Sequence, residues 1–146
     1  MNTFQQVDIL LAEDTATDAE MTMRALRKRG LANNLIWVKD GSEAIDFLFH
    51  EGGFAGTVSG KPKLVLLDVK MPKVDGIEVL RRIRADPALH AVPVVMLTSS
   101  AEERDMVESY RLGANSYIVK PVDTFDFDKV ISDTGFYWML VNKVPT

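Results

Sequence analysis

The feature of this 146-residue sequence that most constrains its fold is a regular alternation of short apolar runs with amphipathic segments. Uninterrupted apolar runs are typical of strands buried on both faces of a parallel sheet, and the amphipathic segments between them are typical of crossover helices. The runs predict five strands, at residues 7–12, 35–38, 64–67, 92–97 and 117–119. We therefore expect one doubly wound α/β domain that occupies residues 1–146.

Turn and capping residues mark the expected ends of the helices. Gly30 and Gly113 stand where a left-handed C-cap would end a helix, and Pro87 is expected to close the third helix. Two residue pairs have the spacing of a capping box, Thr17 with Glu20 and Ser100 with Glu103. The last helix is expected to begin near Thr124 and to contain Gly135 as a weak point.

Composition excludes several classes of protein. A formal net charge of −4 argues against a nucleic-acid-binding surface, because phosphate backbones attract clustered lysine and arginine. The absence of cysteine excludes disulfides, thiolate catalysis and sulfur-ligated zinc, and His50 and His90 lack ligand-like spacing. No segment reaches the roughly 18 apolar residues that a membrane span needs. We expect a soluble cytoplasmic protein without nucleic-acid or membrane partners.

The long connection at residues 50–63 is rich in glycine and predicts a mobile surface loop. Within it, residues 55–62 (AGTVSGKP) suggest a phosphate-binding loop. That motif requires glycine where Ala55 stands and serine or threonine where Pro62 stands, and it follows a strand, whereas this segment precedes one. We therefore assign no nucleotide-binding role to the segment.

Polar residues follow four of the predicted strands. Glu13 and Asp14 follow the first, Asp68 follows the third, Thr98 the fourth and Lys120 the fifth. Right-handed crossovers place the carboxyl ends of parallel strands on one edge of the sheet, so these side chains should converge. Close carboxylates repel one another, and a hard divalent cation such as Mg²⁺ relieves that repulsion. The sequence therefore predicts a metal site at this edge.

Phosphoryl transfer is the chemistry that suits this set of residues. A carboxylate can form an aspartyl phosphate directly, and Asp68, which follows the middle run, is the best-placed nucleophile. The reaction mainly requires positioning and neutralisation of charge, which a cation, the Lys120 ammonium and the Thr98 hydroxyl can supply. We thus predict a site that accepts a phosphoryl group.

Four motifs, in the same order along the chain, resemble those of the response-regulator receiver family. They are residues 11–14 (LAED), 66–72 (LLDVKMP) with Asp75 and Gly76, 96–99 (MLTS) and 117–121 (YIVKP). The resemblance covers nearly the whole chain and implies a flavodoxin-like (βα)5 fold with strand order 2-1-3-4-5. It also implies a two-component response regulator that is phosphorylated and then switches a protein-interaction surface.

The resemblance implies a phosphoacceptor and a set of ligands for Mg²⁺ or Mn²⁺. Asp68 would accept the phosphoryl group and also bind the metal. Asp14 would be a direct metal ligand, and Glu13 would act largely through water. The backbone carbonyl of Lys70 would complete the protein ligands, while its side chain stands at a position that tunes the lifetime of the phosphoryl group.

The resemblance implies that a second group of residues contacts the phosphoryl group or changes conformation in the switch. Lys120 would pair with the phosphoryl group, and Thr98 would hydrogen-bond to it after transfer. Tyr117 matches the switch aromatic of the family, which is expected to turn inward when Thr98 moves. The Lys120–Pro121 bond resembles one that is cis in receivers, and an X-Pro bond tolerates cis at little cost.

Two other functions compete with this one. A phosphohydrolase of the haloacid-dehalogenase type also uses an aspartate nucleophile after a buried strand, but it requires a second acid at the position of Lys70. An interaction module that keeps the fold without phosphorylation is the other alternative, and the intact acidic set argues against it. We expect no enzyme activity beyond self-phosphorylation from a phosphodonor and self-dephosphorylation.

The resemblance also implies an output surface and a partner. In receivers that surface is built from the fourth helix, the fifth strand and the fifth helix, and we hypothesise a homodimer through it. The last helix carries apolar side chains beyond its core stripe, namely Phe125, Phe136, Tyr137, Met139 and Leu140. A narrower resemblance, in the loop before Lys63 and in residues 114–117 and 135–138, is to small single-domain regulators that partner phytochrome-type histidine kinases. The expected partner is a sensor histidine kinase, with a phytochrome as the specific hypothesis.

Overall fold

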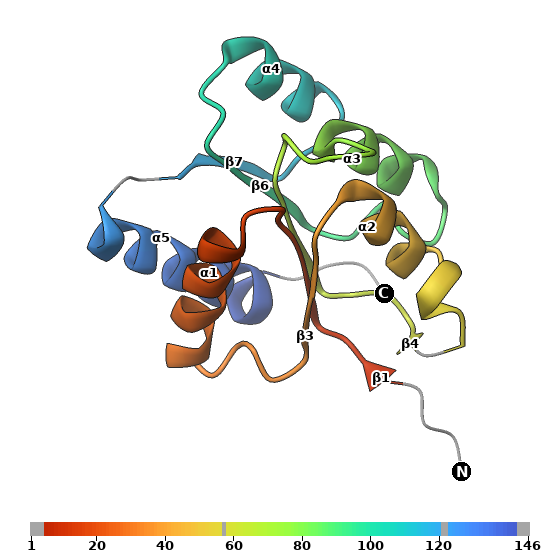
Figure 1. The fold of residues 1–146 in the computed structure, drawn as a ribbon, viewed down its shortest axis with the longest axis horizontal. Coiled ribbons are helices and arrows are strands. Elements are labelled where there is room, and N and C mark those ends of the chain that lie inside the picture. Colours follow the sequence, from red (N-terminus) through yellow and green to blue (C-terminus); the bar gives the residue numbers. More distant parts are fainter. Residues whose placement is uncertain (1–4, 57, 121–122, 143–146) are drawn as a thin grey trace.

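A computed structural model of the chain describes residues 5–56, 58–120 and 123–142 (Figure 1). Within these ranges, five parallel strands form one sheet in the order β3–β2–β5–β6–β7. Their bounds are Ile9–Ala12 for β2, Leu35–Val38 for β3, Leu64–Leu67 for β5, Val94–Thr98 for β6 and Ser116–Val119 for β7. Numbered along the chain, this order is 2-1-3-4-5, so the predicted flavodoxin-like sheet is confirmed.

The central strands are apolar on both faces because both faces are covered. Leu11 pairs with Leu66, and Leu66 pairs with Val95, so these residues form a continuous row that belongs to one core layer. Leu10 and Val65 pair in the same way and belong to the core layer on the other face. Each strand thus contributes alternate residues to two layers, which explains its uninterrupted apolar run.

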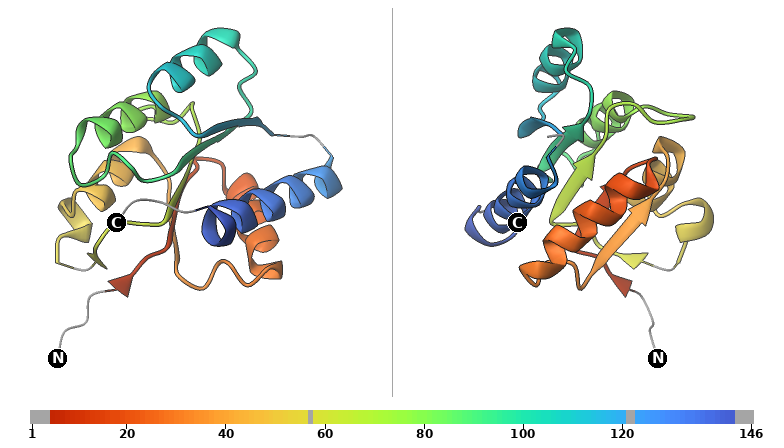
Figure 2. Two further views of the ribbon diagram at one scale, coloured as in Figure 1. Left: turned by 180° about the vertical axis from the view of Figure 1, so that it is seen from behind. Right: turned by 60° about the vertical axis from the view of Figure 1, so that its left-hand side comes forward.

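One face of the sheet is covered by α1 (Ala16–Lys28) and α5 (Thr124–Phe136), which lie side by side (Figures 1 and 2). Leu26 of α1 and Ile131 of α5 are buried in the same core layer. A Cβ at Gly135 would lie 2.5 Å from Leu26 Cδ2, so this glycine permits the close approach of the two helices. The expected weak point is therefore a packing contact, and α5 continues through it.

The other face of the sheet is covered by α2 (Gly41–Leu48), α3 (Gly76–Ala85) and α4 (Glu103–Arg111) (Figure 1). Phe47 of α2 and Leu80 of α3 are buried in the second core layer. α3 lies between the other two helices and contacts both, and α4 also contacts β7. This arrangement places the beginning of α4 close to the carboxyl ends of the last strands.

Aspartates cap the first turn of three helices, and glycines end two helices. The side chains of Asp40, Asp75 and Asp123 accept hydrogen bonds from backbone amides at the starts of α2, α3 and α5. Gly30 and Gly113 have φ angles of +69° and +97°, so the two predicted left-handed C-caps are confirmed.

The two predicted capping boxes are wrong. α1 begins after Thr15, which makes no side-chain cap, so Thr17 lies inside the first turn. α4 begins after Glu102, and the Ser100 hydroxyl donates to Asp105 Oδ2 at 2.7 Å instead of capping a helix as predicted. In both cases the spacing of a capping box occurs two residues away from the true N-cap of the helix.

The segment 50–63 contains more regular structure than its glycine content predicts. It holds a 3-10 turn, η1 (Gly52–Phe54), and a short strand, β4 (Val58–Ser59). β4 pairs in parallel with β1 (Gln5–Gln6) to form a second, two-stranded sheet. The first strand of the main sheet accordingly begins at Ile9, two residues later than predicted.

α5 runs directly into a π-helical turn, η2 (Tyr137–Val141). Of the apolar side chains expected beyond its core stripe, Phe125, Tyr137 and Leu140 are exposed, whereas Phe136 is partly covered by the Arg29 guanidinium at 4.7 Å from its ring centroid. No helix in the described part of the chain has the length and apolar character needed to cross a bilayer.

Candidate functional site

Backbone pairing sets the positions of the two central acids. Asp68 follows β5, and its amide donates to the Ala12 carbonyl oxygen at 3.0 Å. Glu13 follows β2, and its amide donates to the Val38 carbonyl oxygen at 3.0 Å. The parallel register thus continues one residue past the strand ends and brings both acids to the carboxyl edge of the sheet.

Three carboxylates converge at this edge, as the sequence predicts. Oxygen atoms of Glu13, Asp14 and Asp68 all lie within 4.8 Å of one another. Glu13 and Asp68 are 1% and 5% exposed, and Asp14 is exposed to solvent. Within the described ranges, the buried Oδ1 of Asp68 has no hydrogen-bond partner. An unpaired buried oxygen beside two further carboxylates fits a hard divalent cation, which prefers oxygen ligands.

Lys120 supplies positive charge to the cluster. Its Nζ donates to Glu13 Oε1 at 2.5 Å, to Asp18 Oδ2 at 2.9 Å and to Asp68 Oδ2 at 3.3 Å. Burial acts to lower its pKa, but hydrogen bonds to Glu13 and Asp18 and the charge of Asp68 raise that pKa above its usual value. Lys120 therefore remains an ammonium group. Its predicted cis bond to Pro121 lies outside the described residues.

Glu13 has a strongly shifted pKa and a fixed orientation. Burial raises the pKa of its carboxyl to about 7, although the hydrogen bond from Lys120 acts to lower it. The Thr15 amide donates to Glu13 Oε2 at 3.1 Å, and Trp37 Nε1 donates to the Glu13 carbonyl oxygen at 2.7 Å. The side chain and the backbone of this acid are therefore each held by a neighbour.

Gly76 allows the loop after β5 to fold tightly over Asp68. A Cβ at this position would lie 1.9 Å from the Asp68 carbonyl oxygen, so any larger residue would force the backbone to move. The Gly76 amide donates to the Val69 carbonyl oxygen at 2.8 Å, and Asp75 caps α3. The Asp75–Gly76 pair singled out in the sequence thus shapes the loop that holds the nucleophile candidate.

Thr98 and Tyr117 are connected through Ser100. The Ser100 amide donates to Thr98 Oγ1 at 3.1 Å, and the Tyr117 hydroxyl donates to the Ser100 carbonyl oxygen at 2.9 Å. Thr98 is fully buried and Tyr117 is partly exposed. The Ser100 hydroxyl also donates to Asp105 of α4. A change at Thr98 therefore has a short route, through one residue, to both Tyr117 and α4.

The Lys70 side chain contacts α4. Its Nζ lies 3.2 Å from Glu102 Oε1 and 3.9 Å from Asp105 Oδ2. These ion pairs connect the loop after Asp68 to the beginning of α4. The role of the Lys70 backbone carbonyl as a metal ligand stays a prediction.

Asp18 and Trp37 contact the cluster and are not among the site residues that the sequence predicts. Asp18 binds Lys120 from the first turn of α1, and its position four residues after Asp14 in the sequence was a signal that could have identified it. Trp37 contacts the backbone of Glu13, and no local motif marks it, because the contact depends on the pairing of β2 with β3.

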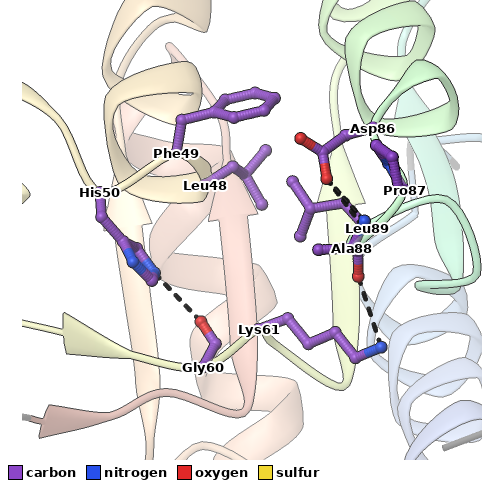
Figure 3. Close-up of a pocket in the computed structure, with 9 residues that line it drawn as sticks. All are labelled: Leu48, Phe49, His50, Gly60, Lys61, Asp86, Pro87, Ala88 and Leu89. Carbon is purple, nitrogen blue, oxygen red and sulfur yellow. Dashed lines mark hydrogen bonds between the residues drawn. The ribbon is translucent and has the colours of Figure 1, made fainter.

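The acidic cluster is separate from a cavity of about 570 Å³ at the opposite, amino edge of the sheet (Figure 3). The polar groups of that cavity contact one another: His50 Nε2 lies 3.1 Å from the Gly60 carbonyl oxygen, and Lys61 Nζ donates to the Ala88 carbonyl oxygen at 3.4 Å. None of the predicted site residues lines it. The candidate site therefore lies apart from this cavity, at the carboxyl edge of the sheet.

Comparison with known proteins identifies the family. Residues 9–132 match the family model described as the response regulator receiver domain. The chain belongs to the response-regulator receiver family. This receiver is 39% identical over 138 residues to the probable methanogenesis regulatory protein FilR2 of Methanothrix harundinacea, a match that covers 94% of this chain and 86% of FilR2. It is also 36% identical over 137 residues to the response regulator Rcp1 of Synechocystis, with coverage of 94% and 92%.

Solved structures agree with this assignment. The receiver superposes on the Mn(2+)-bound form of Rcp1 with a TM-score of 0.87 at 35% identity, covering 96% of this chain and 99% of that one. For the phosphorylated cyanobacterial phytochrome response regulator RcpA, the TM-score is 0.88 at 34% identity, with coverage of 98% and 99%. The chain is thus a two-component response regulator, of a family whose members are not classical enzymes, and the two rival functions are not favoured. The acidic cluster and the Mn(2+)-bound relative together support a divalent-metal site.

Proposed function

We propose that Asp68 accepts a phosphoryl group from a phosphohistidine of a sensor histidine kinase. The observation that carries the proposal is the buried Asp68 carboxylate, which has one unpaired oxygen and lies beside Lys120 and two further acids. A buried charged oxygen without a partner is costly, so its retention points to a function. Nucleophilic attack is a function that a carboxylate oxygen can perform directly.

In the proposed step, a carboxylate oxygen of Asp68 attacks phosphorus, an O–P bond forms and the N–P bond of the phosphohistidine breaks. The electron pair of the broken bond returns to the imidazole, whose other nitrogen carries a proton, so neutral histidine leaves. Lys120, already within 3.3 Å of Asp68 Oδ2, neutralises negative charge on the transferred group. This chain therefore contributes the nucleophile, its orientation and a fixed positive charge.

Mg²⁺, or Mn²⁺, is the proposed cation. Its protein ligands would be the Asp14 and Asp68 carboxylates and the Lys70 backbone carbonyl, with Glu13 acting largely through water. When bound, such an ion relieves the repulsion among the acids and neutralises phosphoryl oxygens. The convergence of three carboxylates within 4.8 Å supports this assignment.

The proposed switch begins at Thr98. Its hydroxyl would hydrogen-bond to the phosphoryl group after transfer, and Tyr117 would then turn inward. Because the Tyr117 hydroxyl now donates to the Ser100 carbonyl oxygen, that turn would break the bond and loosen the link between Ser100 and α4. Phosphorylation would thereby alter the surface formed by α4, β7 and α5.

This surface is the proposed homodimer interface. Val107 and Tyr110 of α4 and Val119 of β7 are 57%, 49% and 40% exposed. Large apolar side chains at such exposure on neighbouring elements favour a protein contact. A second copy of the chain would bind to this exposed face. Sedimentation at high protein concentration tests for the homodimer.

The proposed phosphodonor is a kinase of the phytochrome type. The similarity to RcpA, a phytochrome response regulator, supports this choice. The test is transfer of label from an autophosphorylated phytochrome kinase to the wild-type receiver but not to Asp68→Asn. A kinase of another class that transfers label much faster would contradict it.

Intact mass spectrometry tests the phosphorylation itself. Incubation with a small phosphodonor and Mg²⁺ should add one phosphoryl group to the wild type, none to Asp68→Asn, and should add it far more slowly to Asp14→Ala. Glu20→Gln, which removes an exposed acid of α1, is the matched control and should behave as the wild type. A phosphoryl group that persists in Asp68→Asn would overturn the assignment. Sustained release of phosphate from a generic phosphomonoester would instead favour the phosphohydrolase.

A further inference from the structure

Asp18 binds Lys120 from outside the group of acids that can hold a metal. Its Oδ2 accepts a hydrogen bond from Lys120 Nζ at 2.9 Å, while the same ammonium also contacts Glu13 and Asp68. Glu13 and Asp68 belong to the converging trio of carboxylates, and Asp18 does not. Asp18 therefore provides Lys120 with a carboxylate partner that a cation in the site would leave in place.

The charges around Lys120 explain why it needs Asp18 as a partner. An ammonium group has three donors, and here Glu13, Asp18 and Asp68 accept them. A divalent cation would draw oxygens of Glu13 and Asp68 toward itself and would also repel the ammonium. Because the Lys120 side chain is only 6% exposed, the ammonium needs a remaining partner to stay in the site.

We propose that Asp18 is a positioning residue for phosphoryl transfer, which holds the Lys120 ammonium beside Asp68 while the metal engages the other acids. The inference rests on the proposed function. Asp18 acts through Lys120 and does not itself contact the phosphoryl group. Without Asp18, Lys120 depends on Glu13 and Asp68 alone, where it competes with the cation for the same oxygens.

A structural role for Asp18 makes a different prediction. Asp18 lies in the first turn of α1, where an acid interacts favourably with the helix dipole. If that were its only role, removal of its charge would lower the thermal stability of the receiver and leave its affinity for a phosphoryl analogue unchanged. Thermal unfolding and ligand affinity therefore separate the two roles.

The test measures the affinity for beryllofluoride, a phosphoryl mimic, at saturating Mg²⁺, with tryptophan fluorescence as the signal. Trp37 is a suitable probe because its indole contacts the Glu13 backbone. Asp18→Asn should bind beryllofluoride about tenfold more weakly, because it loses a charge-assisted contact to Lys120. Asp18→Glu should recover most of that loss, and Glu20→Gln, on the same helix, should match the wild type.

A double-mutant cycle with Lys120→Gln shows whether Asp18 acts through Lys120. In the Lys120→Gln background, Asp18→Asn should change the affinity less than about twofold. Wild-type affinity in Asp18→Asn, or an equal loss in both backgrounds, would overturn the inference. Failure of the wild type to bind beryllofluoride is a distinguishable result, which overturns the proposed function and the inference with it.

Discussion

The buried carboxyl of Glu13 links the stability of the receiver to pH. Burial raises its pKa from an ordinary 4.5 to about 7 in the folded protein. The folded state therefore binds this proton more tightly than the unfolded state does. The stabilising contribution of Glu13 is thus fully present below pH 4.5 and is lost as pH rises through about 7.

We predict from this linkage that metal-free wild type loses stability between pH values of about 5 and about 8 more steeply than Glu13→Gln. The amide of glutamine cannot ionise, so the variant lacks this part of the pH dependence. Urea unfolding at a series of pH values, in the presence of a chelator, measures the free energy of unfolding of both proteins. Parallel pH profiles for the two would show that Glu13 does not carry the shifted pKa.

Gly76 offers a second test at the scale of one residue. Gly76→Ala should lower the free energy of unfolding by about 3 kcal/mol and slow phosphorylation, because its Cβ would lie 1.9 Å from the Asp68 carbonyl oxygen. Gly53→Ala is the matched control, since nothing lies within 4 Å of a Cβ there. It should change stability by less than about 0.5 kcal/mol. Equal stability of the two variants in urea unfolding would contradict the close approach.

At the scale of elements, one hydrogen bond of the Tyr117 hydroxyl connects β7 to the segment that precedes α4. Tyr117→Phe removes the donor to the Ser100 carbonyl oxygen and should cost about 1 kcal/mol. Amide hydrogen exchange in residues 100–111 should then accelerate, while phosphorylation of Asp68 continues. Tyr137→Phe, at an exposed position of η2, is the control and should leave exchange in α4 unchanged. Unaltered exchange in Tyr117→Phe would remove Tyr117 from the proposed switch.

Elements whose position depends on the burial of apolar residues were predictable from the sequence. Element boundaries that depend on one particular side-chain contact were not. The central strands were found because both faces of each are packed, as Leu10 and Leu11 illustrate. The start of α1 was not predicted correctly. The Thr15 amide donates to the side chain of Glu13, a residue of the site, and not to a capping-box residue. Such a contact cannot be predicted from a motif that depends on residue spacing alone.

The same distinction applies to the site. Parallel topology requires residues after neighbouring strands to meet, so the convergence of Glu13, Asp14 and Asp68 followed from the order of strands. The contact between Lys120 and Asp18 depends on how α1 is rotated against the sheet. The apolar pattern does not determine this rotation accurately enough to predict a single hydrogen bond. The fold and the acids were thus predictable, whereas the complete set of partners of Lys120 was not.

At the scale of the whole molecule, the site and the exposed apolar surface are joined through α4. Ser100 contacts Thr98 at the carboxyl edge and Asp105 in α4, and Lys70 adds ion pairs to the same end of that helix. The outward face of α4 carries Val107 among its exposed residues. A change at the proposed phosphorylation site would therefore reach this surface through contacts at the beginning of a single helix.

The proposed homodimer can be tested at Val107, which is 57% exposed on α4. Val107→Asp should weaken dimerisation at least about tenfold, because each subunit of a symmetric dimer would place a desolvated charge in the interface. Its phosphorylation by a small phosphodonor should match the wild type, since the residue lies outside the acidic cluster. Ala55→Asp adds the same charge at an exposed position after η1 and should leave the dimer intact. Analytical ultracentrifugation over a range of concentrations, with and without phosphorylation, measures all three proteins, and a wild type that stays monomeric throughout would refute the dimer.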